Sequence, residues 1–421
     1  MLLRFGVTNH RSLRDTQELS LVASTLDDSP AGLIDSRHAP GHKLLPVLAI
    51  YGANASGKTN LVSAIRWMRS AVLYSHSRGE PDGPIGRTPF ALDPSSGGSP
   101  SRFEVDFVLE DVRYHYGFEA TNIAFTAEWL FAFPNDRRQA LFERDGMTFR
   151  FGRNLKGRNQ VISDLTRSNS LFLSAAAQNG HEELTKISKF FQTMASGELR
   201  EFDWMHNFTD TAMDARVMGF LKAAGTGVVD YRLKDVEVPP ELQALQDGIE
   251  ALVKTLGKIQ IENSNTRPNR AQIQLAHKSV GGDSVYFDLQ QESEGTKRLL
   301  GFLIPAFRAL DTGAVMVVDE LDASLHTQAC DLVIALFSSP ATNPKGAQLI
   351  ATTHDTNLLQ SEYLRRDQVW LAEKDAEGAT HLYPLTDFRT RKTDNLERGY
   401  LEGRYGAIPF SGRASDILAT L

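Results

Sequence analysis

The chain contains a single cysteine, Cys330, among its 421 residues. One cysteine cannot form an internal disulfide, and a zinc site built from several thiolates is excluded as well. This cysteine usage is typical of proteins that are kept in a reducing compartment. We therefore expect a cytoplasmic protein in which Cys330 contributes to packing.

Long apolar runs are also missing from the sequence. No stretch approaches the roughly 20 apolar residues that a membrane-spanning helix needs, and the opening MLLRFGVTNHRSL lacks the apolar core of a signal peptide. No heptad pattern continues long enough for an extended coiled coil. The sequence thus predicts no association with a membrane.

The sequence also lacks an excess of basic residues. The chain has 45 Lys and Arg against 52 Asp and Glu, which gives a formal net charge of −7 at pH 7. This balance argues against binding of nucleic acid through overall charge, although it leaves room for a local basic patch. The length exceeds that of one typical core, so we expect two lobes or domains.

Residues 47–51 (VLAIY) form an apolar run typical of a buried strand, followed by the loop GANASGKT and a segment with helical spacing. The loop fits G-x-x-x-x-G-K-[ST] through Gly52, Gly57, Lys58 and Thr59. Such a loop directs amide groups and a helix N-terminus at a phosphate. Lys58 would reach the β- and γ-phosphates of ATP, and Thr59 would offer its hydroxyl to Mg²⁺. The alternative is a glycine-rich turn before an ordinary helix.

A second apolar run, VMVV at 315–318, ends in Asp319 and Glu320. Open α/β sheets bind ligands at the carboxyl ends of their strands, so Asp319 would hold the Mg²⁺ shell and Glu320 would orient or deprotonate water. The alternative, a strand ending at a solvated surface, is less favoured after a P-loop. His354 ends the next apolar run, ATTH, and either contacts the γ-phosphate or serves a structural role.

The remaining pattern predicts further elements. Period-two alternation with aromatic residues indicates an antiparallel meander over 103–152. Helical spacing is found at 181–200, and Pro239-Pro240 with Gly257 favours another helix at 240–257. Arg11 lies in a polar turn between two N-terminal strands, where it is either a phosphate or base contact or part of a solvated loop.

The order of P-loop, ESEGT, VMVVDE, LDASLH and TTH resembles that of ABC-type ATPases of the SMC/RecF/OLD-like group. The chain is most similar to the compact AAA-family ATPases of bacterial antiphage and abortive-infection loci. This resemblance implies an α/β fold: an ABC-type P-loop NTPase core with an antiparallel β subdomain and a helical insertion lobe. The implied domains are an N-terminal ATPase lobe at 1–180, the helical lobe at 181–282 and a C-terminal ATPase lobe at 283–421.

The resemblance also assigns site residues. Ser293 and Gly295 of ESEGT would be the signature that caps ATP bound to a second protomer, and Leu321, Asp322 and Ser324 would form the D-loop. An N-cap with an acidic first turn is the alternative for ESEGT. The predicted nucleotide-binding residues are Gly52, Asn54, Gly57, Lys58, Thr59, Asn60, Ser293 and Gly295. The predicted metal ligands are Thr59, Asp319 and the Q-loop candidate Gln178, and the predicted catalytic residues are Lys58, Glu320 and His354.

The function that the resemblance implies is an ATP hydrolase acting as a nucleotide-dependent switch or scaffold. It would form a homodimer through an ATP sandwich, with higher oligomers also compatible, and would control a protein effector encoded nearby in an antiphage system. The alternatives are a DNA-binding RecF/SMC-like repair or maintenance ATPase, a scaffold with negligible hydrolysis and a transporter ATPase. The segment after His354 is too short for the Toprim nuclease domain of OLD proteins. The tail at 389–410 either binds a partner or docks as a structural segment.

Overall fold

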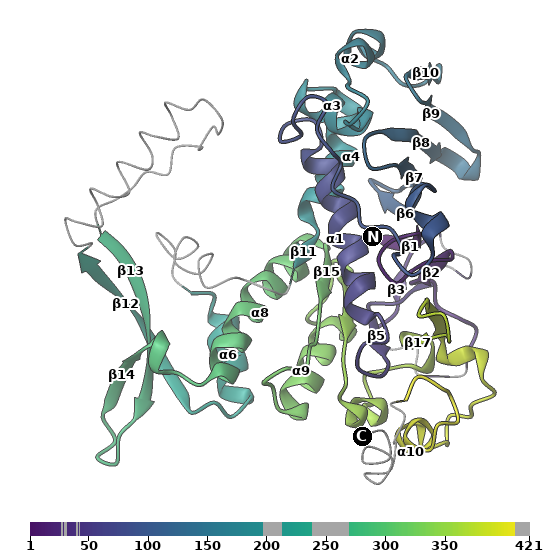
Figure 1. The fold of residues 1–421 in the computed structure, drawn as a ribbon. Coiled ribbons are helices and arrows are strands. Elements are labelled where there is room, and N and C mark those ends of the chain that lie inside the picture. The colour runs from purple at the N-terminus through teal and green to yellow at the C-terminus, as the bar shows by residue number, and fades with distance from the viewer. Residues whose placement is uncertain are drawn as a thin grey trace, which may run out of the picture. The chain divides into compact units, whose positions relative to one another are not determined.

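The computed structural model describes residues 1–26, 28, 32–38, 41, 43–196, 213–237 and 269–408. The chain divides into two compact units, Met1–Gly197 with Pro305–Leu421, and Glu198–Ile304 (Figure 1). The predicted α/β class is confirmed, because parallel and antiparallel sheets occur together with helices. The predicted boundaries at 180 and 282 differ from this division, which assigns 181–197 to the first unit and 283–304 to the second.

Seven antiparallel strands form one sheet of the first unit, in the order β10-β9-β8-β7-β6-β1-β2. The strands are β1 (Leu2–Thr8), β2 (Gln17–Ser20), β6 (Ser101–Leu109), β7 (Val112–Ala120), β8 (Phe125–Phe133), β9 (Gln139–Asp145) and β10 (Thr148–Phe151). The predicted meander is confirmed, since β6 to β10 pair consecutively. The N-terminal strands extend the same sheet through the pairing of β1 with β6.

A second sheet of the first unit has the order β11-β15-β16-β5-β17-β18 and is parallel except for β18. Its strands are β5 (Val47–Tyr51), β11 (Ala195–Ser196), β15 (Val315–Val318), β16 (Gln348–Thr352), β17 (Val369–Lys374) and β18 (Thr380–Pro384). Every residue of β5, β15 and β16 is buried. Covered parallel strands read as continuous apolar runs, which explains why the sequence pattern located them. A short hairpin, β3 (Ile34–Asp35) with β4 (Lys43–Leu44), lies apart from both sheets in the pairing.

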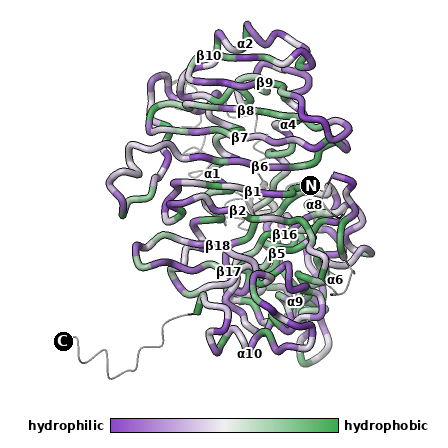
Figure 2. The backbone as a smooth tube through the Cα atoms, turned by 90° about the vertical axis from the view of Figure 1, so that its right-hand side faces the viewer, coloured by the Kyte–Doolittle hydropathy of each residue, from purple (hydrophilic) through white to green (hydrophobic). Residues whose placement is uncertain are grey.

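The helices of the first unit are α1 (Lys58–Tyr74), α2 (Asn159–Leu165), α3 (Phe172–Gln178), α4 (Glu182–Thr193), α9 (Thr327–Ser338) and α10 (Leu396–Leu401). Helix α1 buries Leu61, Ile65 and Met68, as their helical spacing predicts. One hydrophobic cluster joins residues of both sheets with those of α1, α3 and α4. The edge strands β2 and β18 lie side by side (Figure 2), where the amide of Leu382 donates to Gln17 Oε1 at 2.7 Å.

The second unit contains α6 (Ala215–Ala223) and an antiparallel sheet of β12 (Val228–Glu237), β13 (Asn269–Lys278) and β14 (Ser284–Asp288). The expected helical lobe therefore includes a sheet, which the alternation VDYRLK at 229–234 already favours. The helix predicted at 240–257 lies outside the described residues. Helix α8 (Glu294–Thr312) begins in this unit and ends in the first. Within the described ranges, we find no helix long and apolar enough to cross a membrane.

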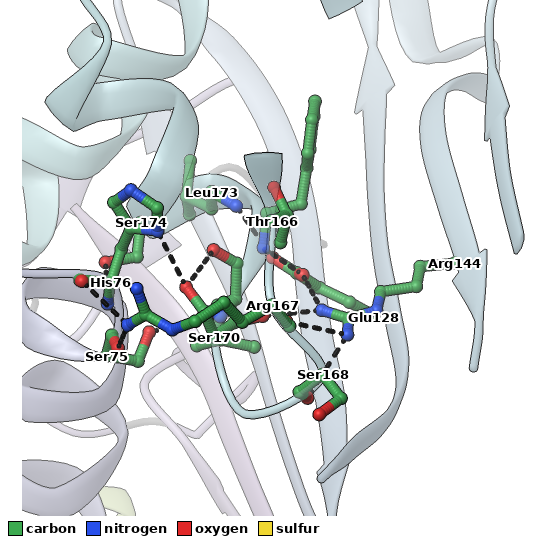
Figure 3. Close-up of polar contacts among 12 residues, drawn as sticks. Ser75, His76, Glu128, Arg144, Thr166, Arg167, Ser168, Ser170, Leu173 and Ser174 are labelled. Atoms are coloured by element: carbon green, nitrogen blue, oxygen red, sulfur yellow. Dashed lines mark hydrogen bonds and ion pairs between the residues drawn. The ribbon is translucent and has the colours of Figure 1, made fainter. Parts of the chain in front are cut away.

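A buried carboxylate connects the meander to α3 (Figure 3). Glu128 of β8 has no exposed side-chain surface and accepts hydrogen bonds from the amides of Phe172 and Leu173 at 2.6 and 3.0 Å. The hydroxyl of Tyr116 donates to it at 3.0 Å. Burial raises the pKa of Glu128, and the positive charge of Arg144 opposes this effect. The carboxylate thus satisfies the first amides of α3, which have no partner inside the helix.

Arg144 of β9 completes the same connection. Its guanidinium lies 3.8 Å from Glu128 and is equally buried. It donates to the carbonyl oxygens of Ser170 at 2.6 Å, Ser168 at 3.2 Å and Arg167 at 3.3 Å (Figure 3). The loop before α3 is therefore held to the sheet by charge-assisted hydrogen bonds at several points.

We predict that Glu128→Gln lowers the free energy of unfolding by about 3 kcal/mol, because Arg144 would keep a buried charge without its partner. Urea denaturation followed by circular dichroism measures the change. Glu143→Gln is the control, since Glu143 lies on β9 with an exposed side chain and its loss should cost less than about 0.5 kcal/mol. Equal effects of the two substitutions would contradict the structural importance of the buried pair.

Candidate nucleotide site

The loop after β5 follows the strand–loop–helix order that the sequence predicts, and it leads directly into α1. Gly57 has φ 105°, in the left-handed region that favours glycine. A Cβ atom at this position would lie 2.0 Å from Thr380 Oγ1 and 2.8 Å from Ser12 Oγ. Both the backbone conformation and the close neighbours therefore require glycine.

Lys58, the first residue of α1, is only 5% exposed. Its ammonium donates to the carbonyl oxygens of Gly52 at 2.7 Å and Ala53 at 2.9 Å. Burial lowers the pKa of Lys58, and nearby carboxylates, Asp319 foremost, oppose the shift. The cation is thus held inside the loop, within reach of any phosphate that the loop amides bind.

A cavity of about 260 Å³ opens above this loop. The residues that line it are Asn54, Ala55, Ser56, Gly57, Lys58, Thr59, Asn60, Glu320, His354 and Lys374. Most of the predicted nucleotide-binding and catalytic residues of the first unit are therefore brought together. Gly52 and Asp319 adjoin the lining residues without forming part of the lining.

The carboxylates reach the cavity because β15, β16 and β5 are parallel neighbours. Val318 pairs with Ala351, and Thr352 pairs with Ile50. The carboxyl ends of the three strands consequently share one edge of the sheet, which is where α/β sheets bind ligands. Glu320 lines the cavity from this edge.

His354 follows β16 at the same edge and has an exposed side chain. Its amide donates to Asp322 Oδ1 at 3.0 Å, which connects the predicted H-loop to the predicted D-loop. Arg11, by contrast, is exposed and does not line the cavity, whereas the neighbouring Ser12 is buried. The solvated-loop interpretation is therefore favoured for Arg11.

A chain of hydrogen bonds supports the P-loop. Asn60 Nδ2 donates to Ser12 Oγ at 2.6 Å, Ser12 Oγ lies 2.8 Å from Thr380 Oγ1, and Thr380 Oγ1 donates to the carbonyl of Ser56 at 2.8 Å. Each hydroxyl can thus accept one hydrogen bond and donate one. The main chain adds a bond from the amide of Thr380 to the carbonyl of Ser12 at 2.7 Å.

The donor set at the cavity suits Mg²⁺ held together with a nucleotide. Thr59 supplies a hydroxyl and Asp319 a carboxylate, both of them hard oxygen ligands. Among the residues that the structure describes, no group of three or more His, Cys, Asp or Glu could hold a metal by itself. Mg²⁺ usually binds through one or two side chains plus substrate phosphates, so this arrangement fits it.

The predicted metal ligand Gln178 lies elsewhere in the first unit. Gln178 ends α3 and does not line the cavity. The loop before α3 bonds to the C-terminal end of α1, where Ser75 Oγ accepts from the amide of Leu171. Thr59 lies at the opposite end of this 17-residue helix, about 25 Å away. The structure therefore does not bring Gln178 to the position of a metal ligand.

The predicted signature belongs to the second unit. Ser293 precedes α8, and the amide of Thr296 donates to Ser293 Oγ at 3.1 Å. The hydroxyl thus forms the N-cap that was the alternative interpretation of ESEGT. Its role toward a second protomer, together with that of Gly295, stays a prediction.

The C-terminal tail docks on the first unit through residue 408. Tyr400 contacts Tyr51 edge to face at 5.9 Å, and its hydroxyl donates to the carbonyl of Ala407 at 2.9 Å. Glu397 accepts a hydrogen bond from the hydroxyl of Thr356 at 3.0 Å. The structural interpretation of the tail is supported, and the tail packs against the end of the strand that carries the P-loop.

A family model described as "AAA domain, putative AbiEii toxin, Type IV TA system" matches residues 47–360, well over half of the chain. The chain belongs to this AAA-domain family. The matched range begins at β5 and includes the P-loop, Glu320 and His354, so it contains the cavity except for Lys374. The expected likeness to compact ATPases of abortive-infection type is confirmed. No curated protein matches the chain.

Sequence reasoning missed two residues of this AAA-domain site. Lys374 ends β17 and lines the cavity, and Thr380 begins β18 and supports the P-loop. No local sequence motif distinguishes either residue. The pairing of β17 with β5 and with β18 brings them beside the loop.

We expect Thr380→Val to weaken ATP binding about tenfold, because the valine cannot join Ser12 to the carbonyl of Ser56 and the loop loses its support; one buried hydrogen bond corresponds to about 1–3 kcal/mol. Isothermal calorimetry measures the affinity. Thr380→Ser, which keeps the hydroxyl, should stay close to wild type. Wild-type affinity in the valine variant would show that the loop needs no such support.

We also expect Lys374→Ala to weaken ATP binding about fivefold, since a cation at the rim of a phosphate site contributes about 1 kcal/mol. The loss should shrink as salt is added, because exposed charges are screened. Lys189→Ala is the control, since Lys189 is an exposed lysine of α4 outside the cavity. A loss that is independent of salt, or equal in the control, would contradict the assignment.

Proposed function

We propose that this AAA-domain protein binds ATP with Mg²⁺ and hydrolyses it to ADP and phosphate. The observation that carries the proposal is a single cavity lined by Lys58, Glu320 and His354, which come from α1 and from the ends of two parallel strands. A phosphate-binding cation, a carboxylate and an imidazole at one sheet edge are the groups that phosphoryl transfer to water requires.

Each residue has a defined task in this proposal. The Lys58 ammonium exchanges its contacts with the carbonyls of Gly52 and Ala53 for oxygens of the β- and γ-phosphates. Glu320 accepts a proton from the attacking water, or orients that water, and His354 contacts the γ-phosphate. Thr59 and Asp319 would hold Mg²⁺, which supplies charge neutralisation at the phosphates.

We further propose that hydrolysis is tied to assembly of a homodimer. All residues that line the cavity belong to the first unit, whereas ESEGT belongs to the second. In the dimer, Ser293 and Gly295 of one protomer would cap the γ-phosphate bound to its partner. Such an arrangement makes the dimer depend on ATP, so hydrolysis would reopen it and the protein would act as a switch.

The partner of this switch is proposed to be a protein effector of an antiphage system. The support is the family description, which refers to a putative AbiEii toxin and a type IV toxin–antitoxin system. The net charge of −7 gives no support to a DNA-binding repair ATPase. Stimulation of hydrolysis by duplex DNA that declines steeply with salt would favour that alternative.

The test combines light scattering with phosphate release for wild type, Glu320→Gln and Lys58→Ala, with and without ATP and Mg²⁺. We expect ATP to increase the mass of the wild type, and Glu320→Gln to trap the larger species while phosphate release falls at least about a hundredfold. Lys58→Ala should show neither change, because its phosphate contacts are lost.

Two outcomes would contradict the proposal. Phosphate release by Glu320→Gln at the wild-type rate would show that Glu320 is not the base. A constant mass in all states would show that ATP acts within a fixed assembly rather than through a dimerisation cycle.

A further inference from the structure

Thr352 is the buried first residue of the TTH motif, in which only His354 has a predicted role. It ends β16, between β15 and β5, and its exposed fraction is 0%. It does not line the cavity. Any effect on catalysis must therefore pass through its neighbours.

The hydroxyl of Thr352 joins these two carboxylate residues. The amide of Glu320 donates to Thr352 Oγ1 at 2.7 Å, and Thr352 Oγ1 donates to Asp319 Oδ1 at 2.6 Å. An amide can only donate and an ionised carboxylate can only accept, so the direction of both bonds is fixed. The carbonyl of Thr352 also accepts from the amide of Leu321 at 2.8 Å.

These bonds surround a strained residue. Glu320 has φ 52°, a left-handed conformation that costs a non-glycine residue of order 1–2 kcal/mol. The bonds to the amides of Glu320 and Leu321 fix the peptide groups on both sides of its Cα atom. Without them, the backbone is free to relax and the Glu320 carboxylate to leave the cavity.

We propose that Thr352 is a positioning residue for hydrolysis, whose hydroxyl holds Glu320 in its strained conformation and orients Asp319. The inference rests on the proposed ATPase function and adds a residue to that site. Thr352 holds the proton acceptor and the predicted metal ligand in one geometry, because a single hydroxyl accepts from one residue and donates to the other.

The test compares Thr352→Val, which has nearly the same shape without the hydroxyl, with Thr352→Ser, which keeps it. We expect kcat to fall at least about tenfold in the valine variant, which is the effect expected from the loss of one buried hydrogen bond. In the serine variant, kcat should stay within about threefold of wild type. Affinity for AMP-PNP in EDTA should stay within about twofold, since the hydroxyl of Thr352 bonds to Glu320 and Asp319 rather than to the P-loop.

The matched control is Thr166→Val. Thr166 is only 2% exposed, its hydroxyl donates to the carbonyl of Ile162 at 2.8 Å, and it does not line the cavity. A fall in kcat of equal size in this control would overturn the proposal. If Thr352→Val does not fold, Thr352→Cys takes its place, because a thiol forms weaker hydrogen bonds than a hydroxyl. The kcat of the cysteine variant should lie between the values predicted above for the valine and serine variants. A wild-type kcat in the valine variant, or in the cysteine variant that replaces it, would overturn the proposal.

A second measurement separates this proposal from the ATPase function itself. Mg²⁺ should raise the affinity of the wild type for AMP-PNP, and Thr352→Val should lose at least about threefold of that gain through the misorientation of Asp319. Absence of hydrolysis in the wild type would overturn the proposed ATPase function, and the Mg²⁺ measurement would still decide the role of Thr352. If Mg²⁺ raises the affinity of Thr352→Val for AMP-PNP as much as that of the wild type, the proposed role of Thr352 is overturned.

Discussion

Parallel pairing of β5, β16 and β15 is the constraint on which the nucleotide site depends. The strands come from distant parts of the chain, yet the pairing of Val318 with Ala351 and of Thr352 with Ile50 places their carboxyl ends at one edge. All three strands are buried on both faces, so a shift of register would break buried backbone hydrogen bonds and displace every side chain at that edge. The P-loop and the carboxylates are therefore placed by the sheet rather than by their own loops.

Buried hydroxyl groups hold the loops that follow these strands in place. Gly57 and Glu320 both have positive φ, and each is held by hydroxyls from other strands or turns: Ser12 and Thr380 at the P-loop, and Thr352 at the carboxylates. A hydroxyl suits this task because it donates and accepts at once, so it can connect two backbone or side-chain groups without leaving an unpaired polar atom. The site is thus stiffened by small uncharged side chains located behind its charged ones.

Local patterns explain how much of this architecture the sequence could predict. The apolar runs of β5, β15 and β16 and the spacing in α1 are properties of short segments, and the corresponding predictions are confirmed. The positions of Lys374 and Gln178 could not be predicted from local patterns. The position of Lys374 depends on the pairing of β17 with β5, and the position of Gln178 depends on the attachment of the preceding loop to the far end of α1. Neither long-range contact can be inferred from the sequence around these two residues.

The hydrogen bonds between Ser12 and Thr380, together with the contact of Tyr400 with Tyr51, have a consequence for biosynthesis. The P-loop leaves the ribosome long before Thr380, which follows Ser56 by 324 residues. Contacts so distant in sequence close slowly and only after the intervening chain has emerged. A nascent or prematurely terminated chain consequently exposes a P-loop without a finished site. The support of the P-loop is therefore complete only after β18 has been made.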